Sequence, residues 1–432
     1  MFPIIVSCRF ARRQFARPPG LFRLFRFAAT AAALALALPR GARSQVPAAV
    51  PLPAVDFASG AWKLMVQGAA FAQFDGQGGP RGGEQLGSTN WGMLMASHAL
   101  AGGELQLRTM LSLDALGVTG FGYPLLLQSG EEYHGAPLHD RQHPHDAFME
   151  LGALYQRHVS NAVGVSFYAA PAGEPALGPT AFMMRPSAMD NPVAPIGHHW
   201  QDVTHVSFGV LTAGLFTKRW KLEGSWFNGR ESDDQRWNFD PIRLDSWSGR
   251  LSFAPGAHWS MSASYGYLNS PEQLEPAVSE HRATLSVAHG MLVGDAGEWS
   301  SSLIWGGNTR DGESLSNSLL AESEFSPDGR NSFIARAEYV QKSASELVVD
   351  IAPFNFASER RFDVSEISLG YVRELTTWRS GTLGVGVLGT LNFVPSTLRA
   401  AYGSSTPAGA VLFVRVRLRR TAMPGMDHMD GM

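Results

Sequence analysis

The chain has 432 residues, 44% of them hydrophobic, with 35 Lys or Arg, 38 Asp or Glu and a single Cys. This composition excludes a polytopic helical membrane protein, which needs repeated apolar runs of about 20 residues, and a disulfide-built scaffold, which needs paired Cys. The net charge of −3 conceals two unlike parts, because residues 1–44 hold eight Arg and no Asp, Glu or Lys, which leaves −11 for the chain from Gln45 onward.

Residues 1–44 have the pattern of a secretory signal peptide. An Arg-rich stretch is followed by the apolar run Phe27–Leu38, which has the length of a signal-peptide core and is short for a membrane span. Ala42-Arg43-Ser44 then supplies small residues at alternate positions, which predicts cleavage before Gln45. Residues 45–60 contain three Pro and are expected to form a flexible lead-in.

From Trp62 onward, apolar residues alternate with polar ones, which is the period of β-strands with two unlike faces. In the last such segment Leu412, Val414 and Val416 fall on one face, and Arg415 and Arg417 fall on the other. A soluble sandwich or propeller also alternates, with its apolar face buried in a core. The alternation therefore predicts an all-β fold without choosing between these architectures.

Segment length and spacing favour a membrane barrel. Most segments have the nine to eleven residues that a tilted transmembrane strand needs, and short periplasmic turns alternating with long outer loops are typical of outer-membrane barrels. A closed barrel also satisfies the backbone polar groups inside a bilayer. The expected strands are residues 62–74, 91–99, 103–113, 147–158, 162–170, 203–216, 219–228, 246–254, 257–268, 280–289, 297–308, 317–325, 331–342, 364–374, 382–392 and 409–419.

The sequence thus predicts a transmembrane antiparallel up-and-down β-barrel over residues 61–420, in the bacterial outer membrane, with about 16 strands, or 14 if one hairpin is misread. The expected long loops are residues 75–90, 114–146, 171–202, 229–245 and 343–363. Arginines and glutamates on the inward faces predict a charged lumen wall.

The tail after Arg420 is expected in the periplasm, because an even number of strands returns the chain to the side where it began. Its last ten residues hold four of the 15 Met, namely Met423, Met426, Met429 and Met432, together with His428. Thioethers are selective ligands for Cu(I), and imidazole binds either copper oxidation state. The alternative is an unselected, disordered terminus.

The tail sequence Met-Pro-Gly-Met-Asp-His-Met-Asp-Gly-Met resembles the Met/His-rich repeats of bacterial copper-resistance proteins, of which copper resistance protein B is the outer-membrane member. In that family the Met-rich region precedes the barrel, whereas here it follows. Residues 138–151, Leu-His-Asp-Arg-Gln-His-Pro-His-Asp-Ala-Phe-Met-Glu-Leu, resemble a block in uncharacterised Gram-negative outer-membrane proteins linked to metal resistance. The resemblance implies copper or other metal handling and assigns no role to a single residue.

A second group of candidate ligands lies in the middle of the chain, where seven of the 13 His fall in the two stretches 134–145 and 198–205. The candidate metal ligands among them are His139, His143, His145, His198 and His199. They belong to two long loops on the same side of the barrel, with Met183, Met184 and Met189 nearby as soft donors. Two readings stay open: a transition-metal site, or a hydrogen-bonded constriction that lines the pore.

We therefore expect a channel or binding protein for copper or another transition metal, and the alternative is a general or solute-selective porin without a metal role. The expected partners are outer-membrane lipid, metal ions or small solutes, and periplasmic metal-handling proteins. Copper ions are the one cofactor that the sequence suggests. Catalysis is not expected, because no Ser and His pair is aligned as a lipid-facing hydrolase requires, and a charge of −11 argues against a nucleic-acid partner.

Overall fold

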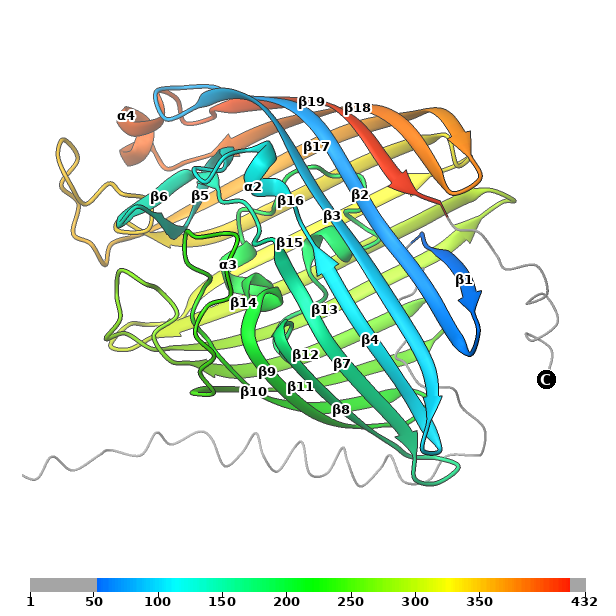
Figure 1. Cartoon of the computed structure of the whole chain (residues 1–432). Coiled ribbons are helices and arrows are strands. Elements are labelled where there is room, and N and C mark those ends of the chain that lie inside the picture. The colour runs from blue at the N-terminus through cyan, green and yellow to red at the C-terminus, as the bar shows by residue number, and fades with distance from the viewer. Residues whose placement is uncertain (1–52, 420–432) are drawn as a thin grey trace, which may run out of the picture. The chain divides into compact units, whose positions relative to one another are not determined.

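The computed structural model describes residues 53–419, in which sixteen antiparallel strands close into a barrel (Figure 1). Each strand pairs with the next along the wall, and closure is completed by β19 pairing with β2. The wall strands are β2 (Trp62–Gln77), β3 (Gly83–Leu100), β4 (Gly103–Leu111), β7 (Phe148–His158), β8 (Gly164–Gly173), β9 (Ser207–Phe216), β10 (Trp220–Phe227), β11 (Ser246–Gly256), β12 (Trp259–Leu268), β13 (Glu280–Val293), β14 (Gly297–Arg310), β15 (Ser316–Ser326), β16 (Asn331–Ser343), β17 (Arg361–Trp378), β18 (Gly381–Phe393) and β19 (Ala408–Leu418).

The two faces of the wall strands differ as the alternation predicts. Leu412 and Val414 of β19 are 57% and 44% exposed on the outside, whereas Phe413 and Arg415 between them are 3% and 0% exposed on the inside. An apolar outer surface and a ladder without free edges are what a bilayer requires of a spanning β-structure. The predicted fold class, strand number and outer-membrane location are confirmed.

The helices of the described residues are single turns: α2 (Asp114–Gly117), α3 (His198–Gln201) and α4 (Arg399–Tyr402), with the 3₁₀ turns η1 (Phe182–Met184), η2 (Val203–His205) and η3 (Ser396–Leu398). Within residues 53–419, none of the helices is long and apolar enough to cross a membrane.

Two predicted boundaries are wrong. The expected long loop 75–90 is the short connection 78–82, because the β2–β3 ladder continues to the pair of Gln77 with Gly83. The expected flexible lead-in 45–60 contains β1 (Val55–Ser59). β19 pairs with β2 only as far as Ala69, so the edge of β2 between Trp62 and Val66 is left for β1, which closes the ladder there.

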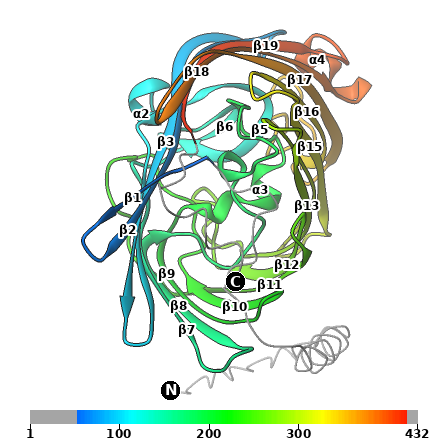
Figure 2. The same cartoon turned by 90° about the vertical axis from the view of Figure 1, so that its right-hand side faces the viewer.

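Two of the long connections lie inside the ring of wall strands (Figure 2). The first carries an inner hairpin, which we define as β5 (Tyr123–Tyr133) and β6 (Ala136–Gln142). Its turn residues His134 and Gly135 have φ of 54° and 76°, the left-handed values of a two-residue hairpin turn that Gly adopts easily. The second is the inner loop, residues 174–206, which carries α3. Together we call them the plug.

Candidate functional site

Buried ion pairs hold the inner loop against the barrel wall. Arg185 of the inner loop donates hydrogen bonds of 2.6 Å to Glu322 of β15 and to Asp202, near the end of the same loop. The other carboxylate oxygen of Glu322 lies 3.3 Å from Nε of Arg336 on β16. All four side chains are at most 4% exposed, so each charge depends on the others for its solvation.

A second ionic group fixes the middle of the inner loop. The carboxylate of Asp190 pairs with Arg415 and lies 3.3 Å from Nη1 of Arg417, both on β19. The backbone N–H of Asp190 donates to Glu324 of β15 at 3.0 Å. Removing one partner of such a buried pair typically costs about 3–5 kcal/mol, so the inner loop has a single strongly preferred position.

Hydrogen bonds to the wall then position α3. Glu338 of β16 accepts hydrogen bonds from the backbone N–H groups of Ile196 at 3.2 Å and Gly197 at 3.0 Å. The indole N–H of Trp200 donates to Ser316 of β15 at 2.7 Å. These hydrogen bonds therefore fix the backbone that carries the two histidines of α3.

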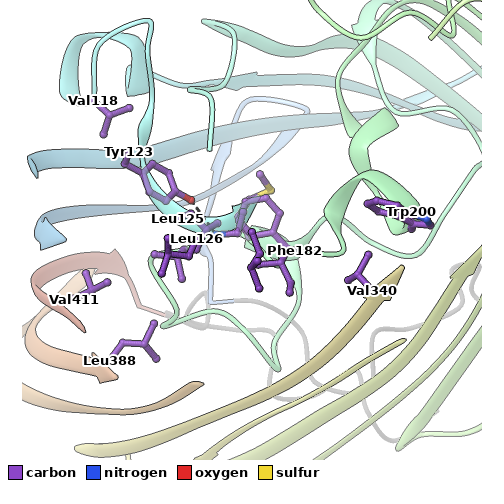
Figure 3. Packing of buried hydrophobic residues seen from close by; sticks show 14 of the residues in the cluster. Val118, Tyr123, Leu125, Leu126, Phe182, Trp200, Val340, Leu388 and Val411 are labelled. Atoms are coloured by element: carbon purple, nitrogen blue, oxygen red, sulfur yellow. Dashed lines mark hydrogen bonds between the residues drawn. The ribbon is translucent and has the colours of Figure 1, made fainter. Parts of the chain in front are cut away.

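An apolar core inside the barrel joins the plug to the wall (Figure 3). Leu125 and Leu126 of the inner hairpin and Trp200 of the inner loop are at most 2% exposed, and Val340 and Leu388 of the wall are fully buried in the same cluster. An outer-membrane channel usually has a polar, water-filled interior. The plug instead fills this part of the lumen with packed side chains.

Five histidines form a closed ring, which we call the histidine ring: His198, His199 and His205 belong to the inner loop, and His143 and His145 directly follow the inner hairpin. In the order His143, His145, His205, His198, His199 and back to His143, successive imidazole centroids lie 6.4, 5.3, 5.2, 5.4 and 6.3 Å apart. The ring of Phe182 packs against three of them. The structure thus brings together four of the five loop histidines that the sequence singles out.

Every member of the histidine ring is anchored through Nδ1. The acceptors are the carbonyl of Pro144 for His143 at 3.0 Å, Asp114 for His145 at 2.7 Å, Asp202 for His198 at 2.6 Å, Glu231 for His199 at 2.9 Å and the carbonyl of Asp202 for His205 at 2.8 Å. For His145, His198, His199 and His205, whose Nε2 atoms face no acid, the acceptor at Nδ1 places the imidazole proton there and leaves a lone pair on Nε2. This is the arrangement that orients metal-binding histidines.

The Nε2 atoms opposite these anchors are unsatisfied. Those of His145, His198, His199 and His205 are buried and have no hydrogen-bond partner among residues 53–419. Nε2 of His143 lies 2.8 Å from Oε1 of Glu131, in a contact without hydrogen-bond geometry. Buried polar atoms are normally paired, and each unpaired one costs about 1–3 kcal/mol. These four nitrogens are potential ligands of a transition-metal ion. Among the described residues, no three of them lie within 4.8 Å of one another, so binding of one ion requires some of the side chains to move.

The electrostatics of the ring favour its metal-binding form. Burial lowers the pKa of His198 to about 4 and the pKa of His199 to about 3. Burial also lowers the pKa of His205 well below its usual value. All three imidazoles are therefore neutral at pH 7, as a ligand nitrogen must be.

Soft and hard donors both lie beside the ring. Met183 and Met189 line a small cavity together with His143 and His145, which adds thioethers of the type that select Cu(I). In a second group, one ligand atom each of Glu131, His143 and His199 lie within 4.8 Å of one another. Burial opposes the charge of Glu131, but His143 and Arg236 outweigh it and lower the pKa of this carboxyl.

The remaining predicted ligands lie elsewhere. Nδ1 of His139 is 2.8 Å from Asp140 and 2.5 Å from Arg81, and this side chain is 38% exposed, so it anchors the inner hairpin outside the histidine ring. The tail ligands Met423, Met426, His428, Met429 and Met432 lie outside the described residues, as does the predicted signal peptide 1–44.

His205 was not among the ligands expected from the sequence, because it falls within the expected strand 203–216. Its acceptor is the backbone carbonyl of Asp202, which a residue of any type could supply, so the sequence carried no signal for this contact. The partners Asp114 and Glu231 gave no signal in the sequence, because they come from other connections and reach the ring only through the fold.

No protein-family model matches the chain, and no curated protein matches it. Solved structures of similar fold include OprB of Pseudomonas putida at high pH, with 12% identity, a TM-score of 0.52, and coverage of 82% of this chain and 94% of OprB. OmpF of Salmonella typhi in complex with daunomycin has 8% identity, a TM-score of 0.50, and coverage of 84% of this chain and 100% of OmpF. At these identities the likeness establishes the fold: a closed outer-membrane barrel of the porin type.

Proposed function

We propose that this protein is an outer-membrane barrel that binds a transition-metal ion in its plug as part of metal handling or resistance, without catalysing a reaction. The observation that carries the proposal is the set of four buried Nε2 atoms without partners, each opposite an anchored Nδ1. An all-imidazole donor set suits Zn²⁺, Ni²⁺, Co²⁺ and Cu²⁺.

Copper is the metal that additional features of the chain favour. Met183 and Met189 stand beside His143 and His145, and the tail adds Met423, Met426, His428, Met429 and Met432. Thioether with imidazole suits Cu(I), and imidazole alone suits Cu²⁺. The likeness of the tail to copper-resistance repeats points the same way. The proposal therefore has two metal sites. The site in the plug is buried, and the site in the tail is shallow and exposed, for exchange of metal with periplasmic metal-handling proteins.

Single substitutions in the histidine ring test the buried site. His198→Gln and His205→Gln are each expected to weaken Co²⁺ and Zn²⁺ binding by at least about tenfold, the loss usual even for an outer-shell partner. His139→Gln, in the plug but outside the ring, and His281→Gln, which contacts Tyr265 on the barrel wall, are the matched controls. Visible absorption of Co²⁺ and calorimetric titration of Zn²⁺ report binding. Equal affinity in ring variants and controls contradicts the buried site.

The tail is tested by truncation after Arg420. Competition with a Cu(I) chelator should show that the mature full-length protein binds more Cu(I) than the truncated one, because the truncation removes four thioethers and one imidazole. Binding of Co²⁺ in the plug serves as the internal control and should not change. Equal Cu(I) binding by the two proteins removes the tail from the proposal.

Acidification tests the protonation state of the ring in the metal-free protein. An exposed histidine has a pKa of about 6.5, and in the fold His198 and His199 have values of about 4 and about 3. The unfolded chain then binds more protons between these values, so stability is present above pH 6.5 and is lost as the pH falls toward 4. From pH 7 to pH 5 the loss should be roughly 2 kcal/mol per histidine.

Urea unfolding at pH 7 and pH 5 measures this loss. The double variant His198→Gln/His199→Gln provides the control, because glutamine does not titrate and the pH dependence should become shallower. A wild-type protein with the same stability at both pH values shows that these imidazoles are not buried as neutral groups.

A porin without a metal role is the second candidate, and the fold shared with OprB and OmpF supports it. Conductance in planar bilayers separates the two. With the plug in place, the wild type should conduct less than a variant in which a short Gly-Ser linker replaces residues 123–142, because the inner hairpin contributes to the core inside the lumen. A wild type that already conducts as well as this variant favours the porin.

A further inference from the structure

Three glutamates from three different connections meet beside the histidine ring. Glu131 belongs to β5, Glu231 to the connection after β10, and Glu272 to the connection after β12. Ligand atoms of His199, Glu231 and Glu272 lie within 4.8 Å of one another, and so do those of Glu131, His143 and His199. His199 is common to both groups and joins the carboxylates to the ring.

The group of His199, Glu231 and Glu272 contains a buried imidazole as well as carboxylates. His199 is 4% exposed, its Nδ1 is 2.9 Å from Glu231, and its buried Nε2 has no hydrogen-bond partner among the described residues. A small hollow is lined by Glu131, Glu231 and Glu272. The exposed Leu274 also lines this hollow, which places it next to solvent at the end of the barrel that carries the long connections.

The nearby guanidinium groups are engaged by other acids. Arg236 pairs with Glu131 and Asp146, Arg282 with Glu280, and Arg310 with Glu275. In the part of the chain that the structure describes, the ion pair of Glu231 is with His199, and Glu272 has none with Lys or Arg. Glu231 and Glu272 thus lie beside an imidazole whose Nε2 has no hydrogen-bond partner, and neither carboxylate forms an ion pair with Lys or Arg among the described residues.

We propose that Glu231, Glu272 and His199, with Glu131 behind them, form a loading site for a divalent cation such as Mn²⁺, Co²⁺ or Zn²⁺ in front of the histidine ring. The site offers both oxygen and nitrogen ligands. The carboxylate oxygens bind a hydrated divalent ion first, and the imidazole of His199 then replaces one of its oxygen ligands with nitrogen. Because His199 and Glu131 belong to the group nearer the ring as well, the ion passes inward by exchanging ligands one at a time. This inference rests on the proposed metal-binding function.

The test measures loading and final binding separately. Stopped-flow absorption should show that Co²⁺ reaches the ring of Glu272→Gln about tenfold more slowly than that of the wild type, with the same final spectrum. Mn²⁺, which prefers oxygen ligands, should bind the wild type at this site by electron paramagnetic resonance and should be lost in Glu272→Gln. Asp234→Asn removes one negative charge from the same connection as Glu231, outside both groups, and should match the wild type.

His198→Gln makes the two proposals distinguishable. It should lose the Co²⁺ spectrum of the ring and keep Mn²⁺ binding. Wild-type loading rates and wild-type Mn²⁺ binding in Glu272→Gln overturn the loading site, even when His198→Gln confirms the ring. A third result is possible, in which the wild type binds Mn²⁺ and Glu272→Gln does not, but no variant or wild type binds Co²⁺ at the ring. This result supports the loading site and contradicts the proposed function. Glu272 is half-buried, so its substitution leaves the core of the plug intact.

Discussion

The position of the inner loop depends on buried charges that pair with one another and with the barrel wall. Arg185 bridges Glu322 of the wall and Asp202 of the loop, and Asp190 pairs with Arg415 of β19. A buried ion pair is often no more stabilising than well-packed apolar residues of similar volume, but a buried charge that loses its partner is costly. The loop is therefore held in one place chiefly because every other place leaves these charges without partners.

The ion pairs that position the inner loop also set the orientation of a histidine side chain in the lumen. Asp202 serves twice, since it pairs with Arg185 and orients His198, so the network that holds the loop also sets the tautomer of a candidate ligand. The apolar core around Trp200 and Leu126 excludes water from the same region. Buried imidazoles whose tautomers are fixed by hydrogen bonds at Nδ1 are suited to binding a transition-metal ion through Nε2.

The wall could be predicted from the sequence, and the plug only in part. Strand residues such as Val414 and Arg415 alternate between lipid and lumen, and a period of two residues is visible in the sequence. In β5, by contrast, Leu125, Leu126 and Leu127 are all fully buried, so no alternation marks the inner hairpin. Clustering in sequence identified most of the ring, whereas His205 and the anchors Asp114 and Glu231 depend on contacts between distant connections.

The metal site is tested most directly by anomalous diffraction from crystals of the mature protein grown with Co²⁺ or Zn²⁺. A bound ion should give an anomalous peak inside the barrel, within about 2.0–2.2 Å of the Nε2 atoms of two or more members of the histidine ring, and the hydrogen bonds at Nδ1 should be kept. Ordered plug residues without such a peak, together with hydrogen bonds from water to these Nε2 atoms, contradict the metal site and leave a plugged barrel of the porin type.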